Sequence, residues 1–278
     1  MACKKIAVVG LGLIGGSVLK ALQGFEQAVF FGIDMQPGVI EQAEKEGLIQ
    51  NQDLSNDEML ACADVVFVCL PPDATISFVN ENKFKNGALV TDVCGVKRAI
   101  LEKIQNPDID FVGGHPMAGK ETSGFAASEA NLFQNAVYLL TPQPHNEDSH
   151  IELLKRMIAY MGCRETVMTT PAEHDDMIAY TSQLMHVVAV TLCDNQHLDR
   201  AKSFSAGSLR DCTRVAKLDS KLWTRLFLHN KSALHACIEE FETSLNTLKE
   251  LVIEEDEQGL ESYLSQCSDR KKKFFEEQ

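Results

Sequence analysis

The 278-residue sequence lacks the features that mark several specialised classes of protein. It has no run of about 18 apolar residues, the length that a membrane-spanning helix needs. It has no excess of positive charge, since 26 Lys and Arg face 40 Asp and Glu for a formal net charge of −14. That balance argues against nucleic acid and anionic membranes as general partners. The nine cysteines include no CxxC pair, so we expect neither a disulfide framework nor a metal site.

The amino terminus superficially resembles a signal peptide, because Lys4 and Lys5 precede an apolar run. Glycines interrupt that run, and no small-residue cleavage site follows it. A first strand and helix are therefore the better interpretation. We expect a cytoplasmic protein.

A glycine-rich loop follows the first predicted strand, Lys5–Val9. The loop reads GLGLIGGS over residues 10–17 and leads into a helical pattern, which gives GxGxxG between a strand and a helix. In dinucleotide-binding proteins the first glycine permits the turn, the second lets the pyrophosphate approach, and the third lets helix pack on strand. The predicted cofactor contacts in this loop are Gly10, Gly12, Leu13, Ile14 and Gly15.

The second predicted strand, residues 28–33, ends in Asp34, which lies 24 positions after Gly10. An acidic residue about 20 positions after the first glycine usually accepts hydrogen bonds from the adenosine ribose. A carboxylate there repels a 2′-phosphate, so the sequence favours NAD over NADP. The alternative is that Asp34 caps the next helix.

Further strands are predicted at residues 63–70, 88–92, 110–112, 136–140 and 164–168, with helices between them. This alternation predicts an α/β Rossmann domain with a mostly parallel, doubly wound sheet. Ligands of such sheets bind beyond the carboxyl ends of the strands. Leu70, Pro71 and Thr91 are therefore expected beside the cofactor.

From Thr170 onward the sequence shows helices and no convincing strand. Thr170, Pro171 and Glu173 have the pattern of a capping box, and apolar residues then recur at helical spacing as far as Val252. We place a domain boundary near residue 169, with a nucleotide-binding domain at 1–169 and an all-α domain at 170–278. The helices carry more apolar surface than a small domain can bury, which predicts a homodimer.

The stretch from Val112 to Gly124 carries the candidate catalytic residue, His115. We expect the strand at 110–112 to break at the two glycines that precede His115. Histidine can accept a proton near neutral pH without much tuning, and ligands bind where this strand would end. For an isolated histidine, a place in a tight surface turn would be the commoner interpretation. The choice between that interpretation and a catalytic role depends on the motifs in the rest of the chain.

These segments resemble the prephenate/arogenate dehydrogenase family of tyrosine biosynthesis, in its short form without a C-terminal ACT domain. The matching pieces follow the family's order: GLGLIGGS (10–17), ADVVFVCLPP (63–72), TDVCGVK (91–97), GGHPMAGKETSG (113–124), SQLMH (182–186) and RDCTRVAKLDSKLW (210–223). The resemblance implies oxidative decarboxylation of a cyclohexadienol with hydride transfer to a nicotinamide. The product would be 4-hydroxyphenylpyruvate from prephenate, or tyrosine from arogenate.

The resemblance also implies site residues. His115 matches the family's catalytic histidine. Arg214 matches the arginine that binds a substrate carboxylate, for which a planar guanidinium is well suited. The residues that the resemblance assigns to the substrate are Arg214, His186, Lys120, Glu121 and Thr122.

Each substrate residue has a plainer interpretation when it is taken alone. Arg214 would pair with Asp211 on a helix surface, and His186 would be a core histidine. A Lys-Glu pair in a loop, such as Lys120 and Glu121, is usually just solvated. Trp223, the only tryptophan, is expected to pack beside the site.

Two positions depart from the family's pattern. Gly95 stands where relatives commonly have a serine near the catalytic histidine, and Met185 replaces a proline. Neither change removes a charged or proton-transferring group. Nothing after residue 254 is long enough for an ACT domain, so feedback inhibition by tyrosine, where it occurs, is expected at the active site.

Two other functions stay open. One is a dehydrogenase of the 6-phosphogluconate-dehydrogenase-like group that acts on a hydroxy acid or imine, although the helical Lys-x-x-Asn pairing of that group is missing. The other is a dinucleotide-sensing protein without turnover. Gly95 keeps the second interpretation open, whereas His115 and Arg214 argue against it.

Overall fold

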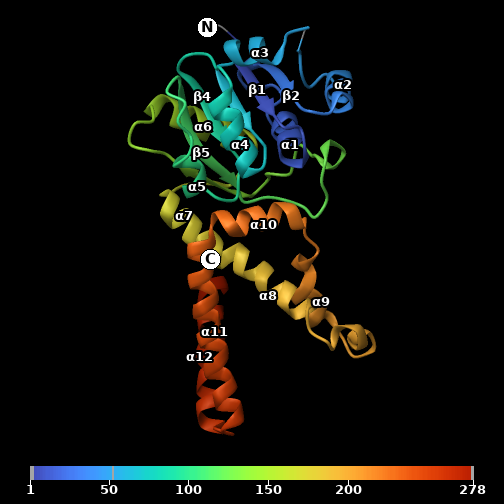
Figure 1. Ribbon diagram of the computed structural model, residues 1–278, viewed down its shortest axis with the longest axis vertical. Coiled ribbons are helices and arrows are strands. Elements are labelled where there is room, and N and C mark those ends of the chain that lie inside the picture. Colours follow the sequence, from blue (N-terminus) through green and yellow to red (C-terminus); the bar gives the residue numbers. More distant parts are fainter. Residues whose placement is uncertain (1–2, 52, 277–278) are drawn as a thin grey trace. The chain divides into compact units, whose positions relative to one another are not determined.

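The computed structural model describes residues 3–51 and 53–276 and divides the chain into two compact units, residues 1–230 and 231–278. The first unit contains a seven-stranded sheet in the order β2-β1-β3-β4-β5-β6-β7 (Figure 1). The strands are β1 (Lys5–Val9), β2 (Val29–Ile33), β3 (Val65–Val68), β4 (Ala88–Asp92), β5 (Ile109–Pro116), β6 (Val137–Thr141) and β7 (Glu165–Met168).

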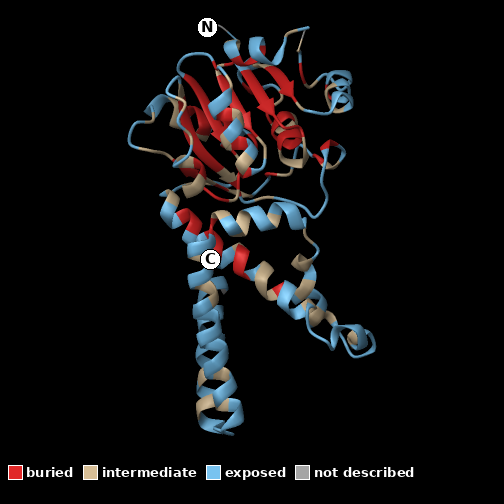
Figure 2. Ribbon diagram, in the orientation of Figure 1, coloured by how far each residue is buried: buried red, intermediate tan, exposed pale blue. Residues whose placement is uncertain are grey.

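Helices cover both faces of this sheet. Side chains of a strand alternate between its two faces, so Ile6 and Val8 join one apolar cluster while Ala7 and Val9 join the other. Figure 2 shows the strands as the most buried part of the chain. The helices of this part are α1 (Leu13–Ala21), α2 (Pro37–Lys45), α3 (Asn56–Cys62), α4 (Pro72–Glu81), α5 (Arg98–Leu101) and α6 (Asp148–Tyr160).

The pairing of the strands confirms the predicted doubly wound, mostly parallel sheet. β2, β1, β3, β4 and β5 are mutually parallel, β6 runs antiparallel to β5, and β7 is parallel to β6. The chain leaves β1 toward β2 on one side and returns to β3 on the other. Ligands of open α/β sheets bind at such a switch point, which here lies where β1 and β3 end.

The expectation that the fifth strand breaks at its two glycines is wrong. β5 runs from Ile109 through Gly113 and Gly114 to Pro116, because it exchanges partners there: Thr91 of β4 is its last parallel partner, and β6 pairs with the rest. The glycines allow this crowded crossing. A Cβ on Gly114 would lie 2.7 Å from the Asp92 carbonyl oxygen, and one on Gly113 would lie 2.4 Å from Thr141 Oγ1.

The described residues after 169 form helices and loops without a strand, as predicted. Thr170 Oγ1 accepts from the Glu173 N–H at 3.2 Å, but the Glu173 carboxylate accepts from Thr169 Oγ1 instead of the Thr170 N–H. Only half of the predicted capping box therefore forms. The helices are α7 (Pro171–Ile178), a π-helical turn (Ala179–Gln183), α8 (Leu184–Cys193), α9 (Gly207–Thr213), α10 (Ser220–His229), α11 (Lys231–Ile253) and α12 (Glu257–Glu276).

The second unit consists of the two long helices α11 and α12 (Figure 1). Several large apolar side chains on them are exposed to solvent: Phe241, Leu245, Val252, Ile253 and Leu264. The predicted boundary near residue 169 stays a prediction. Within residues 3–51 and 53–276, none of the helices has the length and apolar character to cross a membrane.

Candidate active site

The glycine loop between β1 and α1 has the shape that a dinucleotide phosphate requires. Gly10 adopts φ +84°, which glycine tolerates and other residues rarely adopt. A Cβ on Gly15 would lie 1.9 Å from the Gly10 carbonyl oxygen, so helix and strand pack too closely for a side chain. No atom lies within 4 Å of a Cβ built on Gly12, which leaves open space in front of the first turn of α1. The N–H groups of Leu13 and Ile14 begin that turn.

The structure places Asp34 directly beside this loop. Its Oδ2 accepts from the Leu11 N–H at 2.7 Å, and its Oδ1 accepts from the Gln36 N–H at 2.8 Å. Asp34 is not the cap of α2, whose N-cap is Gln36, so the capping alternative is wrong. A carboxylate has about four lone-pair sites, so two backbone bonds leave it able to accept from ribose hydroxyls.

The other predicted cofactor residues differ in their exposure. Leu70 contacts the glycine loop, since its Cδ2 lies 2.7 Å from the position of a Cβ on Gly10, and Pro71 is exposed at the same strand end. Thr91, by contrast, is fully buried in β4 beside Gly114. That burial does not favour a direct contact between the Thr91 side chain and a cofactor.

His115 lies half-buried near the end of β5 and has a histidine partner that the sequence reasoning missed. Its Nδ1 lies 3.0 Å from Nε2 of His174 on α7. His174 in turn places its Nδ1 at 2.8 Å from Oδ1 of the next residue, Asp175. Both His174 and Asp175 are 1% exposed. The sequence signal for them is weak: they are an adjacent His-Asp pair in the first turns of a helix.

Two buried carboxylates hold this region together. Asp175 accepts the N–H groups of Lys97 and Arg98 at 2.8 and 2.9 Å. Asp92 pairs with the fully buried ammonium of Lys97 and accepts the Gly114 N–H at 3.1 Å. Gly114 directly precedes His115 in β5. The loop after β4, the start of α7 and the end of β5 are thus fastened to one another around His115.

This environment keeps both histidines neutral. Burial lowers the pKa of His115 well below its usual value, and the charges of His174 and Lys97 act in the same direction. Burial also lowers the pKa of His174, against the opposing effect of its hydrogen bond to Asp175. A neutral His115 can accept a proton, as a general base must.

Arg214 joins the loop that follows His115. It lies in a short 3-10 turn, Arg214–Ala216, and its Nη1 donates to Oε1 of Glu121 at 2.7 Å. Asp211 instead lies near Arg210, at 3.7 Å from its Nε. The structure therefore pairs Arg214 with the loop, 93 residues earlier in the chain, and not with Asp211.

His186 and Trp223 stack on each other, with ring centroids 3.5 Å apart and planes 27° apart. His186 Nδ1 donates to the Ser182 carbonyl oxygen at 2.9 Å, so its Nε2 remains available as an acceptor. Burial lowers the pKa of His186, and the Arg214 charge acts in the same direction. His186 is thus half-buried, and the charge of Arg214 acts on it. A core histidine would be fully buried among apolar side chains.

Two predicted substrate residues lie farther out in the loop. Lys120 forms an ion pair with Glu129, and both side chains are substantially exposed. Thr122 is exposed next to Glu121. The geometry therefore links Glu121 to Arg214 and Arg214 to His186, with His115 six residues before Glu121 in the chain. Lys120 instead pairs with Glu129.

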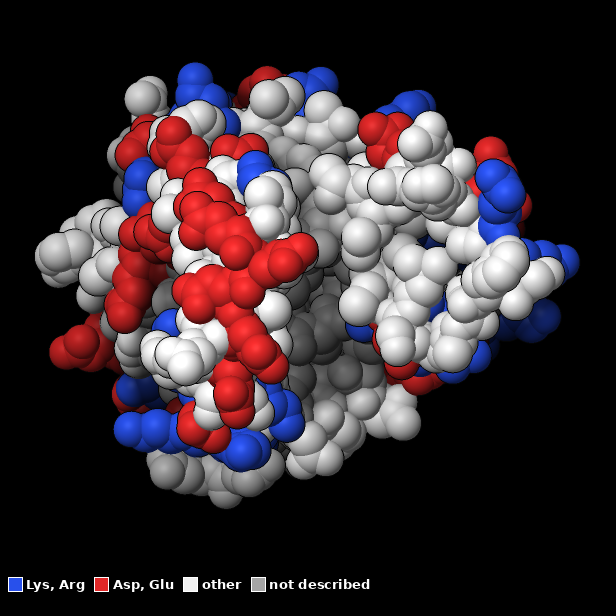
Figure 3. All heavy atoms as spheres, turned by 90° about the horizontal axis from the view of Figure 1, so that it is seen from below, with Lys and Arg blue, Asp and Glu red and all other residues white. Residues whose placement is uncertain are grey.

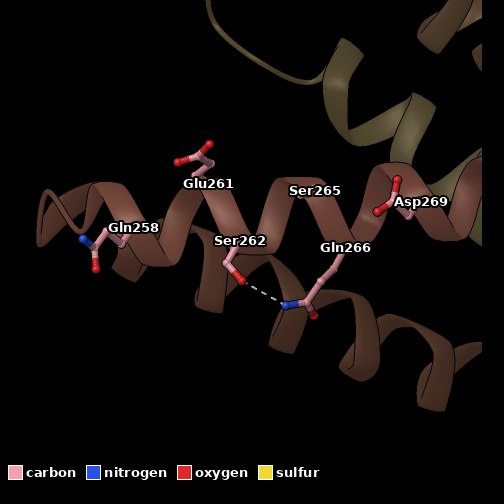
Figure 4. A pocket seen from close by; sticks show the side chains of 6 residues that line it. All are labelled: Gln258, Glu261, Ser262, Ser265, Gln266 and Asp269. Atoms are coloured by element: carbon pink, nitrogen blue, oxygen red, sulfur yellow. Dashed lines mark hydrogen bonds between the residues drawn. The ribbon is translucent and has the colours of Figure 1, made fainter.

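A hollow on the second unit has a lining that does not suit an anionic substrate. A shallow hollow runs along α12 (Figure 4), lined by Gln258, Glu261, Ser262, Ser265, Gln266 and Asp269. Its two charged residues are both acidic, and Gln266 is already bonded to Ser262 at 3.1 Å. Figure 3 shows acidic side chains gathered on one part of the face that it draws. Residues 254–257, where α11 ends and α12 begins, are all acidic. Across residues 3–51 and 53–276, no cluster of side chains has the make-up of a metal site.

Comparison with known protein families agrees with this geometry. Residues 17–167 match the nucleotide-binding domain of prephenate dehydrogenase, and residues 170–266 match the prephenate dehydrogenase dimerization domain. Prephenate dehydrogenase from Bacillus subtilis (strain 168) is 30% identical over 276 residues, covering 95% of this chain and 74% of the relative. The chain belongs to the prephenate dehydrogenase family.

Solved structures of family members share the whole fold. The structure of prephenate dehydrogenase from A. aeolicus in complex with hydroxyphenyl propionate and NAD+ superposes with a TM-score of 0.89 at 31% identity, over 99% of both chains. Synechocystis arogenate dehydrogenase superposes with a TM-score of 0.82 at 30% identity, over 97% of this chain and 99% of that one. This prephenate dehydrogenase family member is therefore an oxidoreductase with a Rossmann nucleotide-binding domain and an all-α domain.

Proposed function

We propose that the chain oxidises prephenate with NAD, releases the ring carboxylate as CO2 and forms 4-hydroxyphenylpyruvate. The observation that carries this proposal is the hydrogen bond between Arg214 and Glu121, which brings a guanidinium to the loop that follows His115. This contact supports a site in which His115 is the base and Arg214 the carboxylate-binding cation. Prephenate presents a hydroxyl at C4 and two carboxylates, which match those two groups.

The residues of the site divide the reaction between them. His115, kept neutral by burial, accepts the proton of the C4 hydroxyl as the C4–H bond breaks. Arg214 holds a substrate carboxylate, which its forked donors can bind in two places. The glycine loop of residues 10–15 would hold the dinucleotide, whose nicotinamide would supply the acceptor for the hydride that leaves C4. Loss of CO2 then makes the ring aromatic, and the carboxylate carbon leaves its bonding electrons in the ring.

Turnover of prephenate with NAD tests the proposal. We expect reduced nicotinamide, measured by its absorbance, and CO2 to appear in equal amounts. A hydroxy-acid dehydrogenase would reduce NAD with a hydroxy acid and leave prephenate unchanged, and a dinucleotide-sensing protein would bind NAD without turnover. Either result would contradict the proposal.

Arogenate is the second candidate substrate, because one solved relative is an arogenate dehydrogenase. The two compounds differ only by a keto or an amino group on the side chain. The ratio of kcat/KM for the two substrates decides which one the chain prefers.

NAD is proposed over NADP because the Asp34 carboxylate lies beside the glycine loop. Replacing Asp34 by Ser should shift kcat/KM toward NADP. A wild-type protein that already prefers NADP would show that Asp34 does not bind the ribose.

We also propose that the protein is a homodimer that buries the exposed apolar side chains of α11 and α12. Phe241, Leu245 and Ile253 are 39%, 52% and 71% exposed, and exposed apolar surface of this kind marks an interface. Light scattering at micromolar concentration should give twice the mass of the chain. A monomeric mass would contradict the proposal.

Where tyrosine inhibits, we propose that it competes for the substrate site, since it shares a six-membered ring and a side-chain carboxylate with the substrate. Such inhibition raises KM for the substrate and leaves kcat unchanged. Inhibition that lowers kcat alone would place tyrosine at another site.

A further inference from the structure

His115 has a hydrogen-bond partner at its Nδ1 edge, and its Nε2 edge lies beside Gly95. The Nδ1 atom lies 3.0 Å from His174 Nε2. On the other edge, the position of a Cβ on Gly95 would be 3.7 Å from His115 Nε2. Gly95 carries no side chain, so it neither donates to Nε2 nor blocks it.

The protons along this chain of contacts have one consistent arrangement. Asp175 accepts two backbone N–H groups and, as a carboxylate, can only accept from His174. His174 therefore carries its proton on Nδ1, which leaves Nε2 as an acceptor. His115 must then carry its own proton on Nδ1 and donate it to His174, which leaves His115 Nε2 unprotonated.

We propose that His174 is a positioning residue that, anchored by Asp175, fixes the tautomer and ring orientation of His115 so that Nε2 accepts the substrate proton. This inference deepens the proposed function and rests on it for the identity of the proton donor. When Nε2 accepts that proton, the resulting imidazolium keeps its Nδ1–H bond to His174. One proton moves from the substrate hydroxyl to His115 Nε2, and the protons on the Nδ1 atoms of His115 and His174 stay where they are.

The backbone supports the same arrangement. Asp175 holds the Lys97 N–H, the Lys97 ammonium pairs with Asp92, and Asp92 holds the Gly114 N–H next to His115. The same network therefore contacts the His115 ring through His174 and the β5 backbone next to His115 through Asp92. A buried ion pair adds little net stability, so its use here is better explained by the geometry that it fixes.

Two variants of His174 separate positioning from simple packing. His174→Asn keeps an amide close to Asp175 but is too short to reach His115, whereas His174→Gln extends an amide oxygen toward the place of Nε2. The matched control is His150→Asn, because His150 also binds a carboxylate through Nδ1, at 2.7 Å from Asp110 Oδ2, outside this site.

The first readout is 15N NMR of histidine-labelled protein without ligands, with the His115 signals assigned through His115→Asn. We expect wild type and His174→Gln to show a protonated Nδ1 and an unprotonated Nε2 on His115. His174→Asn should show a mixture of tautomers, and His150→Asn should match wild type. An unchanged His115 tautomer in a folded His174→Asn protein would overturn the proposal.

The second readout is steady-state kinetics with prephenate and NAD. His174→Asn should lower kcat about 10- to 100-fold with KM little changed, the size of effect that misplacement of a reacting group by about 1 Å produces. His174→Gln should recover most of that loss. Equal losses in both variants would overturn positioning, as would a change in KM alone. A protein that shows the tautomer shift but no turnover of prephenate would instead contradict the proposed substrate.

Discussion

The two sides of the candidate site differ in burial. Around His115, the side chains of His174, Asp92 and Lys97 are fully buried. On the proposed carboxylate-binding side, by contrast, the Arg214 and Glu121 side chains are 65% and 51% exposed. Water and salt screen interactions between exposed charges, whereas buried groups keep their full effect. The proposed proton-accepting side is therefore fixed by buried contacts, whereas the proposed carboxylate-binding side is screened by solvent until substrate displaces water.

This difference separates two kinds of kinetic effect. Groups that act only in the transition state change kcat, while groups that bind the substrate equally before and during reaction change KM. We expect the buried side to control kcat and the exposed side to control KM.

His115→Asn should give the largest loss. Asparagine keeps a hydrogen-bonding group but is not a base, so kcat should fall about 10²- to 10⁴-fold while KM changes little. Steady-state kinetics with saturating NAD measures this. A variant with wild-type kcat would move proton transfer to another group, for which His186 is the next candidate.

Arg214→Gln should chiefly raise KM. Glutamine loses the charge that binds a carboxylate, and hydrogen bonds to charged groups contribute about 1.5–3 kcal/mol, which corresponds to roughly a 10- to 100-fold rise in KM. The kcat value should stay within a few-fold of wild type. A fall in kcat with unchanged KM would break the division between the two sides.

The pH dependence of kcat/KM should reflect the buried side. Burial lowers the pKa of His115 below its usual value of 6.5. The base is active when neutral, so kcat/KM should stay constant as pH falls to 6.5 and decline only below that value. The pH profile of His115→Asn should lack this acid limb. A decline that begins above pH 6.5 would mean that His115 is not held neutral by burial.

The sequence predicted the parts of this molecule that have local signals. The glycine loop, Asp34 and the alternation of strands and helices are set by short patterns, and the structure contains each of them. The path of β5 was mispredicted because glycine usually ends a strand. Here Gly113 and Gly114 lie where β5 changes its pairing partner from β4 to β6. Because β6 begins only at Val137, the local sequence around the glycines does not reveal this change.

The support behind His115 had no such signal. His174 contacts His115 across 59 positions of sequence, and Lys97 looks like an ordinary lysine at the start of a helix. A buried network becomes visible only when the fold brings β4, β5 and α7 together. One clue was present in the sequence, because the adjacent pair His174 and Asp175 lies one helical turn before the apolar Ile178. The structure shows that all three side chains are buried on α7.

Glu121→Gln should give the smallest effect and is the sharpest test of the exposed side. Glutamine keeps an oxygen that can accept from Arg214 Nη1, now at 2.7 Å from Glu121 Oε1, but it removes a negative charge from the path of an anionic substrate. Exposed ion pairs contribute about 0–1 kcal/mol, so KM should fall by less than about 5-fold and kcat should not change. Because screening acts on exposed charges, the difference in KM between Glu121→Gln and wild type should shrink as salt is added. Lys120→Gln is the matched control, since Lys120 lies in the same loop but pairs with Glu129. A salt-independent loss of kcat in Glu121→Gln would show that the exposed pair takes part in the transition state as the buried side does.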